Sequence, residues 1–180
     1  MKKIYLILIF LMAYKCFYAQ TKEYSKRNVV SVDVSFLVLP RGYTDKLLYG
    51  GGISYLHAVS THDCLGLNFQ YYTESVEFPN PKYTLFYLQT EYRKYFGTKP
   101  LDGFYLAINL GIEDFTITQV NSGGALYDTK PEKNISSGLG LGFDYPFGKY
   151  FSGYLKGGLG YVFKFEQVRY NFGGGVAFHF

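Results

Sequence analysis

From residue 30 onward, the chain alternates between apolar side chains and polar or small ones. In the first run the two sets would occupy opposite faces, with Val30, Val32, Val34, Phe36 and Val38 against Ser31, Asp33 and Ser35. A period of two residues predicts a β-strand with one apolar side. The run at 104–113 is the clearest, because five large apolar side chains alternate there without a break, which excludes a helix.

Eight such runs follow one another, at residues 30–38, 49–59, 65–72, 86–96, 104–113, 135–145, 151–165 and 169–180. The runs are eight to fifteen residues long, close to the length that crosses a bilayer at the usual strand tilt. Long connections (40–48, 75–82 and 121–133) alternate with shorter ones (60–63, 97–102 and 146–149), and Glu166 and Gln167 form a small fourth loop. The pattern predicts an all-β fold, an eight-stranded antiparallel up-and-down outer-membrane β-barrel with both chain ends in the periplasm.

The polar face of each run favours a membrane barrel over a soluble one. It consists mostly of Gly, Ser, Asn and Ala with few charges, which suits a narrow lumen better than a water-facing surface. The composition agrees, with 21 Gly, 20 Tyr, 17 Phe and no Trp, and several tyrosines lie near strand ends where interfacial girdles form. An exported soluble barrel or sandwich is the alternative.

The first nineteen residues predict a secretory signal peptide, which leaves residues 20–180 as the barrel domain. Lys2 and Lys3 precede an apolar run that is too short to span a bilayer, and Ala19 suits a cleavage site. A lipoprotein cut before Cys16 is an alternative, although Lys15 stands where a small residue is needed.

Removal of the signal peptide changes what the charge and the cysteines imply. Three lysines leave with it, so 15 basic residues face 14 acidic ones, and direct nucleic-acid binding is not expected. Cys64 is then the single cysteine, which excludes an internal disulfide and a metal site built on a cysteine pair.

Charged side chains on the predicted lumen side are the candidate site. They are Asp33, Glu91, Arg93, Glu113, Asp144, Lys156, Lys164 and Arg169. Because buried charges persist only when they are paired, a mixed set in a narrow lumen predicts a salt-bridge network that plugs the barrel. A selective ion path is the functional alternative.

The histidines could in principle serve catalysis. A hydrolase would need a nucleophile within about 3 Å of a histidine nitrogen, with access from the lipid or the lumen mouth. His57 falls on the lipid side, His179 on the lumen side, and no serine can be placed beside either from the sequence. His62, Asp63 and Cys64 predict a turn. We therefore expect no catalytic, cofactor-binding or metal site, and the Gly-rich stretches lack the following helix of a phosphate loop.

Several segments together give the mature chain a resemblance to the TraO family of conjugative-transposon proteins of Bacteroidetes. They are Tyr18-Ala19-Gln20, Glu91-Tyr92-Arg93-Lys94-Tyr95-Phe96, Leu126-Tyr127-Asp128, the Gly-x-Gly-x-Gly of 138–142, and Gly174-Gly175-Val176-Ala177-Phe178-His179-Phe180. Thr129 departs from the pattern, which has a glycine there. The resemblance implies an outer-membrane barrel that takes part in transferring mobile DNA between cells, with other conjugation proteins as partners and no catalytic residues.

The sequence thus predicts a non-enzymatic barrel in the cell outer membrane, in contact with lipid, whose outer loops meet a partner. A general barrel for adhesion, small-solute passage or envelope integrity is the first alternative, and an outer-membrane lipid-modifying enzyme is the second. The aromatic residues Phe178 and Phe180 of the last strand predict an assembly signal read by the barrel assembly machinery.

Overall fold

A computed structural model describes residues 27–39, 46–74, 82–97, 101–120, 126–128, 131–147 and 149–180. The predicted signal peptide, with Cys16 and the expected cut after Ala19, lies outside these residues. In the described part of the chain, no helix is long and apolar enough to cross a membrane.

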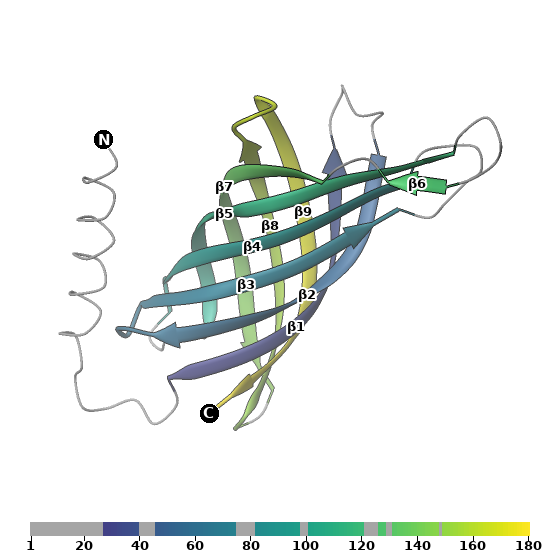
Figure 1. Ribbon diagram of the computed structural model, residues 1–180. Coiled ribbons are helices and arrows are strands. Elements are labelled where there is room, and N and C mark those ends of the chain that lie inside the picture. Colours follow the sequence, from purple (N-terminus) through teal and green to yellow (C-terminus); the bar gives the residue numbers. More distant parts are fainter. Residues whose placement is uncertain are drawn as a thin grey trace.

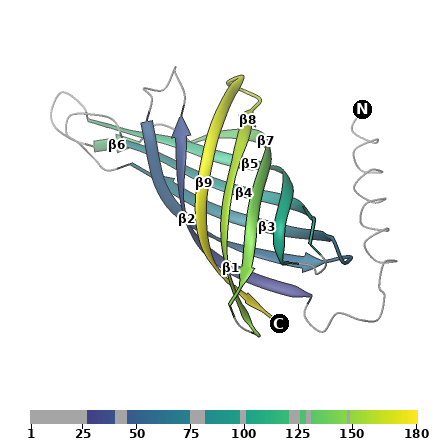
Figure 2. The same ribbon diagram turned by 180° about the vertical axis from the view of Figure 1, so that it is seen from behind.

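The described residues form one antiparallel sheet, eight strands of which close into a barrel (Figure 1). The strands are β1 (Asn28–Leu39), β2 (Lys46–Ala58), β3 (Asp63–Thr73), β4 (Lys82–Tyr95), β5 (Gly103–Val120), β6 (Leu126–Asp128), β7 (Glu132–Pro146), β8 (Phe151–Val162) and β9 (Gln167–His179). Each barrel strand pairs with the next, β5 pairs with β7, and β1 pairs with β9 to close the sheet. Figure 2 shows the opposite wall, where β9, β8 and β7 lie next to one another. The predicted eight-stranded antiparallel barrel is confirmed.

Apolar side chains cover the outside of this barrel. Val34, Leu139 and Leu155 are each more than 60% exposed, and comparable residues follow on all eight barrel strands. A soluble monomer rarely exposes a contiguous apolar patch larger than a few hundred Å². A band that runs around the whole barrel is instead the surface that contacts lipid, and closure leaves none of the paired barrel strands with an open edge there.

On β5 the polarity of the two faces reverses towards the end of the barrel that carries the long connections. On β5, Ile112 is 57% exposed on the outside, while the adjacent Glu113 is buried inside. Two residues further, Asp114 lies on the outer side and Phe115 is buried inside. On this strand the apolar belt therefore ends between Ile112 and Asp114, and the strand continues beyond it. We call this end of the barrel the loop end, and the end with the connections at 59–62 and 147–150 the turn end.

The structure moves several boundaries of the predicted strands; β2 begins at Lys46 rather than at residue 49, and β4 at Lys82 rather than at residue 86. β5 runs to Val120 rather than to residue 113, and the short strand β6 pairs with its last residues within the predicted 121–133 loop. Figure 1 shows this pair beyond the rim of the barrel. β8 ends at Val162, and the connection to β9 is the turn 163–166, in which Glu166 has a φ of 52°. Gln167 already belongs to β9.

Two layers of buried apolar side chains fill the interior, one at each end. The turn-end layer comprises Val29, Leu56, Ala58, Cys64, Tyr95, Leu101, Tyr105, Ala107, Tyr154 and Ala177. The loop-end layer comprises Leu37, Leu39, Leu48, Tyr72, Tyr83, Leu85, Tyr87 and Phe115. In both layers every side chain named is at most 6% exposed. The polar side chains of the lumen are therefore enclosed between apolar ends.

Candidate functional site

Seven of the eight predicted lumen charges lie inside the barrel. Asp33, Glu91, Arg93, Glu113, Asp144 and Arg169 are each at most 7% exposed, and the Lys156 side chain is 16% exposed. The eighth prediction, Lys164, is wrong. Because β8 ends two residues earlier, Lys164 lies in the exposed turn, where its Nζ is 2.9 Å from Glu132 Oε2.

Arg93 centres the first group of charges, near the turn end. Its Nε donates to Glu91 Oε1 at 2.6 Å, and its Nη1 lies 3.8 Å from Asp144 Oδ2. The Tyr95 hydroxyl donates to the same Asp144 oxygen. The guanidinium carbon also lies 4.5 Å from the centre of the Tyr105 ring, within cation–π range. One cation therefore holds two carboxylates in place, and β4, β5 and β7 supply the groups.

Lys156 and Asp33 form a second pair across the junction of β1 and β9 that closes the barrel, which we call the closing seam. Lys156 Nζ on β8 is 2.6 Å from Asp33 Oδ2 on β1, and the Tyr154 hydroxyl donates to the same oxygen at 3.2 Å. These two strands are not neighbours, because β9 lies between them. At that level β9 carries only Gly173, Gly174 and Gly175, and a Cβ at Gly175 would lie 2.9 Å from the Tyr154 hydroxyl. The glycines thus leave the space through which β8 side chains reach β1.

Arg169 and Glu113 form the third pair, towards the loop end. Arg169 Nη1 donates to Glu113 Oε2 at 2.9 Å and to the Tyr87 hydroxyl at 2.8 Å. Asn134 Nδ2 approaches the other Glu113 oxygen at 3.5 Å. The two charged side chains are at most 2% exposed. All seven lumen charges are therefore paired with an opposite charge, which is the condition under which buried charges persist.

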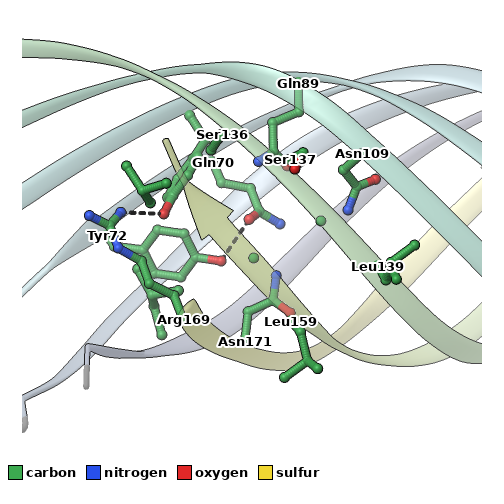
Figure 3. Close-up of a pocket in the computed structure, with 15 residues that line it drawn as sticks. Gln70, Tyr72, Gln89, Asn109, Ser136, Ser137, Leu139, Leu159, Arg169 and Asn171 are labelled. Atoms are coloured by element: carbon green, nitrogen blue, oxygen red, sulfur yellow. Dashed lines mark hydrogen bonds between the residues drawn. The ribbon is translucent and has the colours of Figure 1, made fainter. Parts of the chain in front are cut away.

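A small cavity lies between these charged groups, near the middle of the barrel (Figure 3). Its lining mixes polar and apolar residues: Leu37 and Val162 line it beside Gln70, Gln89, Asn109, Ser136, Ser137 and Asn171, with Arg169 at one side. The volume open to the centres of water-sized molecules is about 30 Å³. That space holds small molecules of the size of water and no larger ligand.

The structure places each histidine and finds one contact that the sequence could not. His57 bonds with Asn28 Oδ1 at 2.8 Å, and His62 is exposed in the turn beside Thr61. His179 Nε2 lies 2.7 Å from Ser152 Oγ, so a serine does stand beside a histidine. Ser152 is only 1% exposed, so the access that a hydrolase needs is lacking at its hydroxyl.

Of the predicted turn at His62, Asp63 and Cys64, only His62 lies in the turn, because β3 begins at Asp63; the turn contains local polar contacts. Ser60 Oγ donates to Asp63 Oδ2 at 2.6 Å, and Tyr92 donates to the other Asp63 oxygen at 2.6 Å. Cys64 is a buried free thiol in the turn-end layer. Among the residues that the structure describes, no group of three His, Cys, Asp or Glu side chains could hold a metal ion.

Buried tyrosines are the part of the site to which the sequence assigned no role. Tyr87, Tyr95 and Tyr154 each hydrogen-bond a lumen charge, whereas the sequence analysis considered tyrosines as interfacial residues. The alternation could have indicated that these tyrosines point into the lumen. Each lies on the same strand face as a predicted lumen charge: Tyr87 with Glu91, Tyr95 with Arg93, and Tyr154 with Lys156.

Comparison with known proteins supports the fold. No family model and no curated protein sequence matches the chain. Among solved structures, Neisserial surface protein A is similar over 85% of this chain and 97% of its own, with a TM-score of 0.65 and 14% identity. Ail, the attachment invasion locus protein of Yersinia pestis, in complex with a heparin analogue, covers 87% of this chain and all of its own, with a TM-score of 0.62 and 13% identity.

The N-terminal β-barrel domain of Pseudomonas aeruginosa OprF is a further match. It covers 87% of this chain and all of its own, with a TM-score of 0.53 and 23% identity. At these identities the likeness concerns the fold alone. This chain therefore has the fold of the small outer-membrane β-barrels.

Proposed function

We propose that this protein is a non-enzymatic outer-membrane barrel with a closed lumen, and that it serves as a structural component of a conjugative-transposon transfer apparatus. The apolar belt supports a position in the membrane, with the loop end facing outward and the turn end facing the periplasm. The resemblance of five segments to the TraO family supports the conjugation role. The barrel holds the outer connections in place, and the 121–133 connection is the largest surface that it offers to another conjugation protein.

The observation that carries this proposal is the filled interior. Seven buried charges are paired, and apolar layers lie at both ends of the lumen. An ion path needs charged groups that meet water along a continuous route, and here the charges lie between apolar layers. The lumen therefore serves stability, and function falls to the outer connections.

Conductance tests the closed lumen directly. Purified protein inserted into planar lipid bilayers should give no discrete conductance steps at neutral pH. A control variant with Tyr95→Ala and Tyr154→Ala empties part of the turn-end layer and keeps the charge pairs, and any conductance it gains shows that insertion took place. Discrete steps from the unaltered protein would contradict the closed lumen.

Gene deletion in a donor cell that carries the mobile element tests the conjugation role. Transfer frequency should fall, and the unaltered gene should restore it. A variant in which a Gly-Ser linker replaces residues 121–125 should insert normally without restoring transfer, and replacement of the turn at 147–150 is the matched control. Unchanged transfer together with a leakier envelope or weaker attachment to surfaces would favour the general barrel instead.

A further inference from the structure

The central cavity is lined by buried polar atoms that lack a hydrogen-bond partner on the protein. Within the described part of the chain, no partner is found for Arg169 Nε, Ser136 Oγ or Asn109 Oδ1. Arg169 and Ser136 are each 2% exposed, so bulk solvent does not supply the missing bonds. Figure 3 shows Arg169, Ser136 and Asn109 around the cavity, on different sides of it. Buried polar groups in folded proteins are rarely left in this state.

We propose that this cavity is a binding site for ordered water. A bound water needs roughly 10–15 Å³ of space measured to its centre, so the cavity of about 30 Å³ has room for about two molecules. Neighbouring polar groups at Gln70, Gln89 and Asn171 provide the further partners that such waters require. The waters complete the polar middle of the lumen, and the two apolar layers separate them from bulk solvent.

The mixture of unsatisfied groups selects water over an ion. Arg169 Nε needs an acceptor, Asn109 Oδ1 needs a donor, and Ser136 Oγ serves as either. A cation would meet the Arg169 guanidinium, and an anion would meet the Asn109 carbonyl oxygen. The charge of Arg169 is already balanced by Glu113 at 2.9 Å, so the cavity holds no uncompensated charge that would attract an ion.

Two glycine substitutions on β8 test whether the cavity is hydrated or dry, because the two cases predict opposite orders of the urea midpoints. Gly160 lines the cavity, and a Cβ there would lie 3.8 Å from its nearest neighbour, the Ser137 carbonyl oxygen. Gly157 stands on the lipid side, where a Cβ would lie 3.7 Å from the Asn171 carbonyl oxygen. Gly160→Ala and Gly157→Ala thus share the same backbone effect and the same freedom from clashes, but differ in where the methyl group goes.

In a hydrated cavity the Gly160→Ala methyl displaces water and leaves polar atoms unsatisfied. We therefore expect its urea midpoint in detergent or vesicles to lie below that of Gly157→Ala. A dry cavity predicts the reverse order, because the methyl would then fill empty space. Nuclear Overhauser contacts between water and the Asn109 side-chain amide in the unaltered protein provide a second readout. A midpoint of Gly160→Ala at or above the control, or the absence of these contacts, would overturn the proposal.

Discussion

Each charge inside this barrel depends on its partner. Arg169 and Glu113 sit 2.9 Å apart at an exposure of at most 2%, so neither can be solvated if the other is lost. Removing one member of a buried pair strands the remaining charge, which is far more damaging than replacing the whole pair by neutral groups. The pairs therefore specify one arrangement of the strands that contribute them, β5 and β9 in this case.

We expect Arg169→Met to lower the free energy of unfolding by about 3–5 kcal/mol, because Glu113 stays buried without its cation. Adding Glu113→Gln should recover part of this loss. Lys164→Met, which breaks the exposed pair with Glu132, is the control and should change stability by at most about 1 kcal/mol. Urea unfolding in detergent followed by circular dichroism measures all three. A double variant no more stable than Arg169→Met would contradict the pairing argument.

Alternation along the chain was enough to predict the face of each charge but not its partner. Asp33 and Lys156 are 123 residues apart in the chain, and their contact depends on the closure of the barrel. Lys164 shows a second limit. The alternation continues through Phe163 and Phe165, so nothing in it indicates that β8 ends at Val162.

The closing seam depends on the glycines of β9. A Cβ at Gly175 would lie 2.0 Å from the Val32 carbonyl oxygen and 2.9 Å from Asp33 Cα. Both atoms belong to the backbone of β1, so no side-chain rotation relieves the contact. β9 can pair with β1 in the observed register only if this residue has no side chain.

Gly175→Ala should therefore weaken closure of the barrel, with a loss of stability of about 1–3 kcal/mol from overpacking. The measurement is the fraction of protein that shows heat-modifiable mobility in detergent gels, together with the urea midpoint. Gly157→Ala on the neighbouring strand is the matched control and should fold normally, since its Cβ meets nothing closer than 3.7 Å. Equal folding of the two variants would mean that β1 and β9 tolerate a shifted backbone.

The end of a strand could be predicted only where its apolar residues stay on one face and its polar residues on the other along its whole length. On β5 the apolar side chains move from the outer to the inner face after Ile112, because the outer face then meets water and Phe115 joins the loop-end layer. A prediction that requires the same face to stay apolar therefore ends the strand near Ile112, although β5 continues to pair with its neighbours beyond that residue. β6 has three residues, too few to show any period.

The whole barrel was predictable because its fold follows from strand number, strand length and the chemistry of lipid. Eight alternating runs with two distinct faces must close in a membrane, since no strand edge can be left unpaired in lipid. The fine structure of the interior was not predictable in the same way. The contact of Ser152 with His179 and the space between the charged groups depend on how side chains from all walls meet.

Assembly of the whole molecule provides the last prediction, which concerns Phe180. Its backbone forms the final pair of bonds with Asn28, at 2.9 and 3.1 Å, and its ring lies 6.0 Å from that of Phe178. Ten further residue pairs, from Val29 with His179 to Val38 with Tyr170, hold β1 to β9 without it. Deleting Phe180 should therefore change the urea midpoint of refolded protein only slightly.

The proposed assembly signal predicts a much larger effect in the cell. With Phe180 deleted, the amount of heat-modifiable protein in the outer-membrane fraction should fall several-fold, because the assembly machinery would no longer recognise the strand. Phe96→Ala is the control, since Phe96 is also an exposed aromatic residue near the turn end and lies outside the predicted signal. If the two variants insert equally well, or if the deletion lowers insertion and stability in proportion, then Phe180 contributes to packing and carries no assembly signal.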